Sequence, residues 1–368
     1  MRTADLGRLG RTALPIVAVL SLVVGLFVGL AGAGDTLGFD FLAYHQAATR
    51  LLDGQPLYDM SFQQTGGFGL FYYPPTFAPL VLVFGWLTPE VAVRAWTAVL
   101  VGASLVAVAI LPVSRTVRWW ILLLMGLSFP YGYAVKLGQV GPLLLLTMAV
   151  GWRWLDEPIR LGASAALGAA IKLQPGLILV WALLTRRFRA VVVGAVVLVV
   201  LGAAATLLAG ASSWTDFLTL ARTVSDPITT PHNFTPGAIG YQLGLSSGTA
   251  TVLQVASTIA AVVALLAAIR WSVSEASYLA AVIVSQLVSP ILWDHYAILL
   301  LLPVAYLLAA GRWWALAIPL ATAWPIVGLT PAVVYPIVFW ISLVATVVVG
   351  WRSARVMDPA TPRPAAAA

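Results

Sequence analysis

Asp40 is the side chain best placed to act as a base. It follows the first apolar stretch of the chain by a few residues and has apolar neighbours in the segment GFDFLAY. A carboxylate in such surroundings can have a raised pKa and can take a proton from a hydroxyl group. A structural role is the alternative, because apolar residues recur at helical spacing over residues 41–52 and an aspartate near a helix start commonly caps backbone N–H groups. Spacing alone favours the cap.

A second cluster with chemical potential lies near the end of the chain. Asp294 and His295 stand between two apolar runs in the segment SPILWDHY. Ionisable residues at membrane depth are costly and usually face a cavity or a partner. A neutral histidine could relay a proton, and a charged one could contact a phosphate. A structural hydrogen bond between two spans would explain this pair equally well.

Lys172 is a cation within the apolar run of residues 161–184. It is too far from both ends of that run for its amine to reach water easily. A buried lysine needs an anion, so a phosphate or an internal carboxylate is expected beside it. Pro175 and Gly176 predict a kink that frees backbone carbonyls towards a cavity. The sequence therefore predicts a functional role for this lysine.

Other kinds of site find little support. His232 and Asn233 lie in a polar loop at residues 212–248, without the spacing of metal ligands. Asp, Glu and His do not recur at ligand spacing anywhere, so no metal is expected. The chain has no cysteine, which excludes disulfides and thiolate chemistry. It also lacks a phosphate-cradling glycine loop, so direct use of ATP is not expected.

The elements that must position these residues are membrane helices. Of the 368 residues, 61% are hydrophobic and 9% are charged, against about 25% charged in soluble domains. We predict an all-α polytopic membrane protein with about twelve spans and interfacial helices in its outer loops. The expected spans are residues 13–30, 75–87, 91–112, 119–133, 140–154, 161–184, 190–209, 250–269, 276–290, 291–309, 313–327 and 332–351.

The basic residues predict how these spans are oriented. The net charge of +7 is explained by basic residues at span ends, so a nucleic-acid partner is not expected. With the N-terminus in the cytoplasm, twelve basic residues, including Lys136, fall on the cytoplasmic side. The six assigned to the outer side are Arg50, Arg115, Arg118, Arg153, Arg160 and Arg222. This bias places both termini in the cytoplasm and the polar loops at residues 35–75 and 212–248 on the outer face.

Two boundaries complete the predicted organisation. The small residues Ala31-Gly32-Ala33 resemble a signal-peptide cleavage site, but the preceding apolar stretch exceeds the ~7–15 residues of such a peptide. We therefore expect a retained first span. Residues 1–351 should form one transmembrane domain, and residues 352–368, which are rich in Pro and Ala, a disordered cytoplasmic tail.

Six segments, taken in order, resemble a known family. They are FDFLAYHQAATRLLDGQPLYD, FYYPPTFAPL, GQVGPLLLL, KLQPGLIL, HNFTPGAIG and SPILWDHYAILLLLP. This ordered set is similar to glycosyltransferase family 87, the actinobacterial type that uses polyprenyl-phosphate-mannose. The resemblance implies a GT-C architecture with its active site on the outer face of the bacterial plasma membrane. It also implies a lipid-phosphate sugar donor and an inverting transfer that needs no metal or other cofactor.

The resemblance also implies roles for individual residues. Asp40 matches the catalytic base in the first outer loop, and His295 matches the histidine of the late Trp-Asp-His motif. Lys172 matches a basic position suited to the donor phosphate. The further candidates for contact with the donor are Tyr44, Tyr73, Asp294, His232 and Asn233. Anchoring in the aromatic belt at the membrane surface is the alternative for the two tyrosines.

The function expected from this resemblance is mannosyl transfer to a lipid-linked or envelope glycan acceptor. The expected partners are a polyprenyl-phosphate sugar donor, a glycolipid or glycan acceptor, and membrane lipids. An arabinose donor would suit the same enzyme class, because the shape of the pocket selects the sugar. A lipid or sugar transporter, or a flippase, is the alternative of a different class, although transporters keep ionisable residues near the midplane of repeated halves.

Overall fold

The computed structural model describes residues 3–61, 69–223 and 226–357, and the named secondary-structure elements of this part are all helices. Side chains are described for residues 12–61, 69–222 and 226–356. The main helices are α1 (Thr3–Ala31), α2 (Phe39–Leu52), α3 (Ala78–Val81), α4 (Pro89–Ile110), α5 (Arg115–Leu127), α6 (Phe129–Leu137), α7 (Gly141–Arg153), α8 (Pro158–Ile171), α9 (Leu177–Leu184), α10 (Phe188–Ala209), α11 (Ser212–Thr223), α12 (Pro236–Gln242), α13 (Ser247–Trp271), α14 (Ser274–Leu287), α15 (Leu301–Ala309), α16 (Ala317–Leu320) and α17 (Val334–Met357). The all-α prediction is confirmed for these residues.

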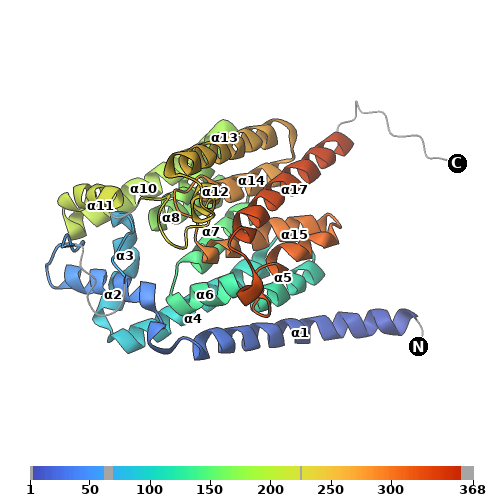
Figure 1. The fold of residues 1–368 in the computed structure, drawn as a ribbon, viewed down its shortest axis with the longest axis horizontal. Coiled ribbons are helices and arrows are strands. Elements are labelled where there is room, and N and C mark those ends of the chain that lie inside the picture. Colours follow the sequence, from blue (N-terminus) through green and yellow to red (C-terminus); the bar gives the residue numbers. More distant parts are fainter. Residues whose placement is uncertain (1–2, 62–68, 224–225, 358–368) are drawn as a thin grey trace.

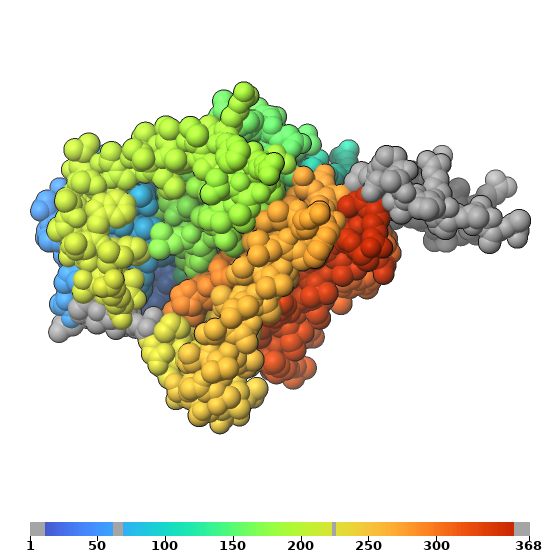
Figure 2. Space-filling model, turned by 90° about the horizontal axis from the view of Figure 1, so that it is seen from above, coloured from blue at the N-terminus to red at the C-terminus, as the bar shows by residue number. Residues whose placement is uncertain are grey.

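Five helices of the described chain are long and apolar enough to cross a membrane: α1, α4, α10, α13 and α17. A sixth candidate span is obtained if α6 and α7, which are bent by 118° relative to each other, are counted as one broken span. The other apolar helices are shorter. Helices α10 and α13 bury few of their apolar side chains inside the bundle. Both lie at the surface in Figure 2, where α13 runs beside α17. Such a surface requires lipid around it.

The bundle has two distinct ends (Figure 1). Helices α2, α3 and α11 gather at one end, which we call the site end. Helix α1 begins and α17 finishes at the other, which we call the opposite end. Helix α2 confirms the helix that the periodicity of residues 41–52 predicts, and α11 is a second short amphipathic helix at this end.

Residues 75–86 do not cross the bundle, so the prediction of a span over residues 75–87 is wrong. The segment consists of two 3₁₀ turns around α3, and it folds back on α2. His45 Nε2 lies 3.0 Å from the carbonyl oxygen of Leu87. Gly85 is so close to α2 that an added Cβ would lie 2.8 Å from Leu52 Cδ1. Twelve residues with two prolines are too few for a crossing, which takes about 20 helical residues.

The predicted span over residues 161–184 is instead a helical hairpin. Helix α8 ends at Ile171, and Lys172 is extended, with φ −144° and ψ 141°. Helix α9 then returns, since Arg187 Nη1 lies 2.9 Å from Asp156 Oδ1 at the base of the hairpin. Pro175 cannot donate a backbone hydrogen bond and would clash within a continuous helix. The chain therefore breaks and reverses where a kink was expected.

These two corrections change the predicted distribution of charge. Without a crossing at residues 75–86, α4 starts at the site end and brings Arg115 and Arg118 to the opposite end. Lys136 moves to the site end, where its carbonyl accepts a 2.8 Å hydrogen bond from Gly38 N. Arg153 and Arg160 join Arg186, Arg187 and Arg189 at the opposite end. Because the hairpin does not cross the bundle, residues from Arg186 onwards keep the side that the sequence predicted for them. More basic residues therefore lie at the opposite end than the sequence predicted.

Helix α1 is an integral part of the bundle. An added Cβ at Gly25 would lie 2.0 Å from the carbonyl oxygen of Gly126 in α5. Ser21 Oγ donates a 3.0 Å hydrogen bond to the carbonyl oxygen of Leu123. Such small residues allow close helix packing in lipid.

The last helix is longer than expected. Helix α17 continues to Met357, so residues 352–357 are helical, contrary to the predicted disordered tail. Arg355 lies over the ring of Trp351 at 3.9 Å, and Ser353 Oγ donates to the carbonyl oxygen of Val349. These contacts within the helix favour its extension. The remainder of the predicted tail lies outside the described residues.

Candidate active site

Asp40 lies in the first turn of α2 but does not cap it. The N-cap is Gly38, whose φ of 73° is in the left-handed region that favours glycine. Oδ2 of Asp40 instead accepts a 2.7 Å hydrogen bond from Nε2 of Gln139. The carboxylate is therefore held by a side chain from another part of the chain, which argues against the structural alternative.

Gln139, in the turn between α6 and α7, links Asp40 to two tyrosines. Its Oε1 accepts a 3.0 Å hydrogen bond from the hydroxyl of Tyr73. That hydroxyl in turn accepts a 2.6 Å hydrogen bond from Tyr44. All three side chains are buried. The chain of donors orients the Gln139 amide, so that its NH₂ group faces Asp40.

Tyr44 and Tyr73 are core residues, so the belt interpretation is wrong for both. Tyr44 is 1% exposed, and its ring packs at 4.7 Å from Tyr73 and 5.3 Å from Phe77. Trp96 belongs to the same aromatic cluster, and its Nε1 donates a 2.8 Å hydrogen bond to the carbonyl oxygen of Gly138. The cluster therefore fixes the turn that carries Gln139.

Lys172 lies at the tip of the α8–α9 hairpin and points towards the same group. Its Nζ donates a hydrogen bond to the hydroxyl of Tyr296 and lies 4.1 Å from the centre of that ring. The ring centre of Tyr73 is 5.6 Å away. Thr76 Oγ1 donates a 2.8 Å hydrogen bond to the carbonyl oxygen of Ala170, which pins the hairpin tip in place.

His295 reaches the site from the segment before α15. Its Nδ1 lies 3.3 Å from Oδ1 of Asp294, which also accepts a 2.6 Å hydrogen bond from the His295 backbone N–H. The ring of Trp293 lies nearly parallel to the imidazole. Nε2 of His295 is buried and has no hydrogen-bond partner within the described part of the chain. Buried polar atoms are normally paired, so this nitrogen is available to a ligand.

His295 and Lys172 lie close enough to Asp40 for their charges to act on its carboxyl. Burial raises the pKa of the Asp40 carboxyl above its usual range. A positive charge on His295, the hydrogen bond from Gln139 and the charge of Lys172 lower it, and the effect of burial exceeds theirs. A carboxylate with a raised pKa is a stronger base than one in water. The arrangement thus brings together a carboxylate that can accept a proton and two groups that can hold an anion.

Asn233 holds two loops together and has no amide group left for a ligand. Its Nδ2 donates to the carbonyl oxygens of Pro227 (2.7 Å) and Pro290 (3.0 Å). Its Oδ1 accepts from the backbone N–H groups of Thr235 (3.1 Å) and Leu292 (2.9 Å). The side chain is 0% exposed. The structure therefore favours a role in positioning the segment before His295 over direct contact with a donor.

His232 stands apart from this cluster. It is exposed, and its φ of 58° places it in the left-handed region. No contact of its side chain with Asp40, Lys172 or His295 is found among the described residues. The structure thus separates it from the other candidates.

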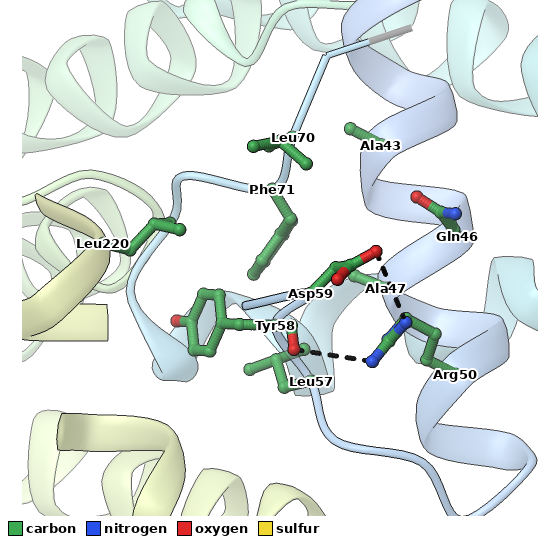
Figure 3. A pocket seen from close by; sticks show the side chains of 10 residues that line it. All are labelled: Ala43, Gln46, Ala47, Arg50, Leu57, Tyr58, Asp59, Leu70, Phe71 and Leu220. Atoms are coloured by element: carbon green, nitrogen blue, oxygen red, sulfur yellow. Dashed lines mark hydrogen bonds and ion pairs between the residues drawn. The ribbon is translucent and has the colours of Figure 1, made fainter. Parts of the chain in front are cut away.

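A small cavity beside α2, shown in Figure 3, belongs to a structural brace. Its volume is about 10 Å³, which suits one water molecule at most. Arg50 Nη1 lies 4.0 Å from Asp59 Oδ2, and Nη2 donates to the carbonyl oxygen of Tyr58. The hydroxyl of Tyr58 donates a 2.7 Å hydrogen bond to the carbonyl oxygen of Tyr73. The brace therefore fixes the backbone that carries Tyr73.

Sequence reasoning missed three polar residues around the site. Gln139 and Tyr296 contact Asp40 and Lys172 directly, and Gln174 Nε2 donates a 2.8 Å hydrogen bond to Ser289 Oγ. Each lies in a segment that supports the family resemblance: GQVGPLLLL, WDHYAILLLLP and KLQPGLIL. In the sequence, these residues could have been recognised as polar side chains at breaks between apolar runs. Among the described residues, no group of three or more His, Asp or Glu side chains could hold a metal ion.

Comparison with known proteins places this site in context. A model of glycosyltransferase family 87 matches residues 71–292, more than half of the chain. The match includes Tyr73, Gln139 and Lys172, whereas Asp40 precedes it and His295 follows it. A similar protein is the polyprenol-phosphate-mannose-dependent alpha-(1-2)-phosphatidylinositol mannoside mannosyltransferase of Mycobacterium tuberculosis, which is 31% identical over 242 residues. The alignment covers 58% of this chain and 55% of that protein, so the chain spans about half of its relative. No solved structure matches the chain.

Proposed function

The chain belongs to glycosyltransferase family 87, and on this premise we propose that it transfers a mannosyl residue from a polyprenyl-phosphate donor to a glycolipid or glycan acceptor. The observation that carries the proposal is the meeting of Asp40, Lys172 and His295 from three segments far apart in sequence. Gln139 and Tyr73 join Asp40 to the neighbourhood of Lys172, whose partner Tyr296 packs against the His295 ring at 5.0 Å. The mycobacterial relative supports the choice of sugar and donor, because its name specifies polyprenol-phosphate-mannose. Its named acceptor, a phosphatidylinositol mannoside, favours a glycolipid here.

Asp40 acts as the base in this proposal. The acceptor hydroxyl gives its proton to the carboxylate while its oxygen forms a bond to the anomeric carbon of mannose. The bond between that carbon and the phosphate oxygen breaks, and the polyprenyl phosphate leaves with the electron pair. Attack opposite the leaving group inverts the anomeric configuration. The Gln139 amide occupies Oδ2 of Asp40, and Oδ1 takes the proton.

Lys172 and His295 hold the donor phosphate. The lysine amine supplies positive charge, and the imidazolium form of His295, which carries a hydrogen on both nitrogens, donates from Nε2 to the phosphate. Both stabilise the negative charge that grows on the departing phosphate. Tyr296 positions the lysine through the hydrogen bond to its hydroxyl. Asp294 orients the imidazole through Nδ1.

The distribution of basic residues supports a site on the outer face of the membrane. Arg115, Arg118, Arg153, Arg160 and the arginines at 186–189 gather at the opposite end. Cytoplasmic ends of membrane proteins are enriched in Lys and Arg. We therefore propose that the opposite end and both termini are cytoplasmic, and that the polyprenyl chain enters the site end from the outer leaflet of a bacterial plasma membrane.

The decisive experiment follows sugar transfer in membranes that contain the full chain. Radiolabelled polyprenyl-phosphate-mannose is added, and the labelled product is identified by chromatography and glycosidase digestion. We expect label in a glycolipid with the wild type and none with Asp40→Asn. Full transfer by Asp40→Asn would remove Asp40 as the base. Transfer from a polyprenyl-phosphate-arabinose donor in place of the mannose donor would reassign the sugar.

A further inference from the structure

A cavity of about 410 Å³ opens at the opposite end of the bundle, far from the candidate active site. It lies between the α7–α8 turn and the α9–α10 turn, and Arg186, Arg187 and Arg189 line it together with Asp156 and apolar residues. Its volume is in the range of small-ligand pockets. Three arginines against one aspartate make the cavity positively charged, so it suits an anion.

One of the three arginines belongs to the wall of the cavity. Arg187 Nη1 donates to the carbonyl oxygen of Leu155 (2.6 Å) and to Asp156 Oδ1 (2.9 Å). Its guanidinium also lies 5.3 Å from the ring of Trp181. These contacts neutralise Asp156 and join the two turns. Within the described chain, no hydrogen bond or ion pair engages the guanidinium of Arg186 or Arg189, so two positive charges remain for a ligand.

The backbone at Arg186 gives a second, independent indication. Arg186 follows the end of α9 with a φ of 61°, and its N–H donates to the carbonyl oxygen of Leu183 while that of Arg187 donates to Ala182. This helix ending normally carries glycine, because a side chain is disfavoured at positive φ. An arginine at such a position is strained, and strained residues cluster at binding sites. Its side chain lines the cavity.

The rest of the lining indicates what kind of anion would fit. Leu161, Pro158 and Phe188 supply apolar surface beside the arginines. Phe188 is 57% exposed and Ile159 is 71% exposed, on helices whose outer surfaces face lipid. An added Cβ at Gly162 would lie 2.2 Å from the carbonyl oxygen of Ala190, so α8 and α10 pack closely beside the cavity. The site combines charge for a phosphate with apolar surface for acyl chains.

We propose that this cavity binds the headgroup of an anionic phospholipid of the membrane leaflet at the opposite end. Arg186 and Arg189 hold the phosphodiester, and Phe188 with its apolar neighbours contacts the glycerol backbone and the first acyl carbons. Basic pockets between membrane helices bind anionic lipid headgroups by this chemistry. The bound lipid would bridge the α7–α8 and α9–α10 turns and so stabilise the base of the hairpin that carries Lys172.

The test measures lipid binding and makes no use of sugar transfer, so it stands apart from the proposed function. The purified full chain in a nonionic detergent is titrated with phosphatidylglycerol, phosphatidylcholine or inorganic phosphate. Tm is followed by tryptophan fluorescence, and retained lipid is counted by native mass spectrometry. The variant Arg186→Gly/Arg189→Gln removes both charges, and its glycine relieves the positive-φ strain, so it should fold. Arg270→Gln/Arg312→Gln, from the same end, is the charge-matched control.

We expect phosphatidylglycerol to raise the Tm of the wild type, and phosphatidylcholine and phosphate not to do so. The Arg186→Gly/Arg189→Gln variant should need roughly tenfold more phosphatidylglycerol for the same shift, whereas the control should respond like the wild type. An absent response in the wild type would overturn the proposal. Equal losses in the variant and the control would overturn it in favour of general surface attraction. An equal shift with inorganic phosphate alone would overturn the lipid assignment in favour of a soluble anion.

Discussion

The Nε2 atom of Gln139 donates a 2.7 Å hydrogen bond to Oδ2 of Asp40, across 99 positions of sequence. This contact joins the turn between α6 and α7 to the first turn of α2. It selects the carboxylate oxygen that remains for an acceptor hydroxyl, and it counteracts part of the rise in pKa that burial causes at Asp40. Gln139 is therefore a positioning residue for the proposed base.

Replacing Gln139 by leucine should slow transfer and shift its pH dependence. Without the amide, the pKa of Asp40 rises further, because a hydrogen bond to the charged form is lost. The acid limb of the kcat/KM profile should move to higher pH, and kcat should fall about ten- to hundredfold through loss of orientation. A purely structural role would lower Tm without moving the acid limb. An unchanged pH profile would therefore contradict this role.

Asp40→Asn should abolish transfer yet stabilise the fold at neutral pH. The pKa of Asp40 is raised in the folded chain, so the folded state binds this proton more tightly than the unfolded state. The stabilisation is complete below the unfolded pKa and is lost as the pH rises through the folded pKa. Asparagine avoids this loss and can keep the hydrogen bond with Gln139.

The Asp40→Asn prediction is checked by Tm at pH 5 and pH 8 together with transfer at neutral pH. Transfer should fall at least about a hundredfold, and the Tm advantage of the variant should be larger at pH 8. Asp53→Asn is the matched control, because Asp53 is exposed at the other end of α2. A Tm advantage that shrinks as the pH rises would refute the assigned pKa direction.

Lys172→Met should weaken binding of the phosphate leaving group. The amine points to the site from the hairpin tip, and its hydrogen bond to Tyr296 keeps it there. Inhibition of transfer by polyprenyl phosphate measures this contact, and its Ki should rise about ten- to hundredfold, as expected for a hydrogen bond to a charged group. Lys172→Arg should recover part of the affinity. A Ki equal to that of the wild type would exclude Lys172 from phosphate binding.

Asn233→Ala should destabilise the chain more than it alters the affinity for donor. The substitution leaves two backbone N–H groups and two carbonyl oxygens without their partner, at a cost of about 2–4 kcal/mol. A marked drop in Tm with an unchanged donor KM would support the positioning role. A normal Tm with a raised donor KM would instead favour direct contact with the donor.

The corrected arrangement of helices can be tested by labelling single cysteines, since the chain has none of its own. Arg160→Cys and Arg312→Cys should react with an impermeant maleimide from the same side of the membrane. Asp53→Cys should react from the other side. Labelling of Arg160→Cys and Asp53→Cys from one side would restore the sequence-based assignment and contradict the fold-back of residues 75–86.

Composition and periodicity can be read from the sequence alone, and they determine that the chain is a helical membrane protein. The longest apolar runs specify membrane helices, and the periodicity of residues 41–52 predicts α2, which is followed by a positive φ at Gly54. Asp40, Lys172 and His295 were identifiable because an ionisable group is rare and costly in such a chain. Gln139 and Tyr296 were not, since neutral polar residues are common at breaks between spans.

Only the tertiary structure decided which short apolar segments cross the bundle. Residues 75–86 and 161–184 are both apolar segments that the sequence predicts to cross, yet the first folds back on α2 and the second forms a hairpin. Hydropathy reports the preference of a segment for lipid, but packing against other helices decides its direction. The same packing brings Lys172 to Tyr296 and Gln139 to Asp40, because these contacts arise only when separate segments are assembled.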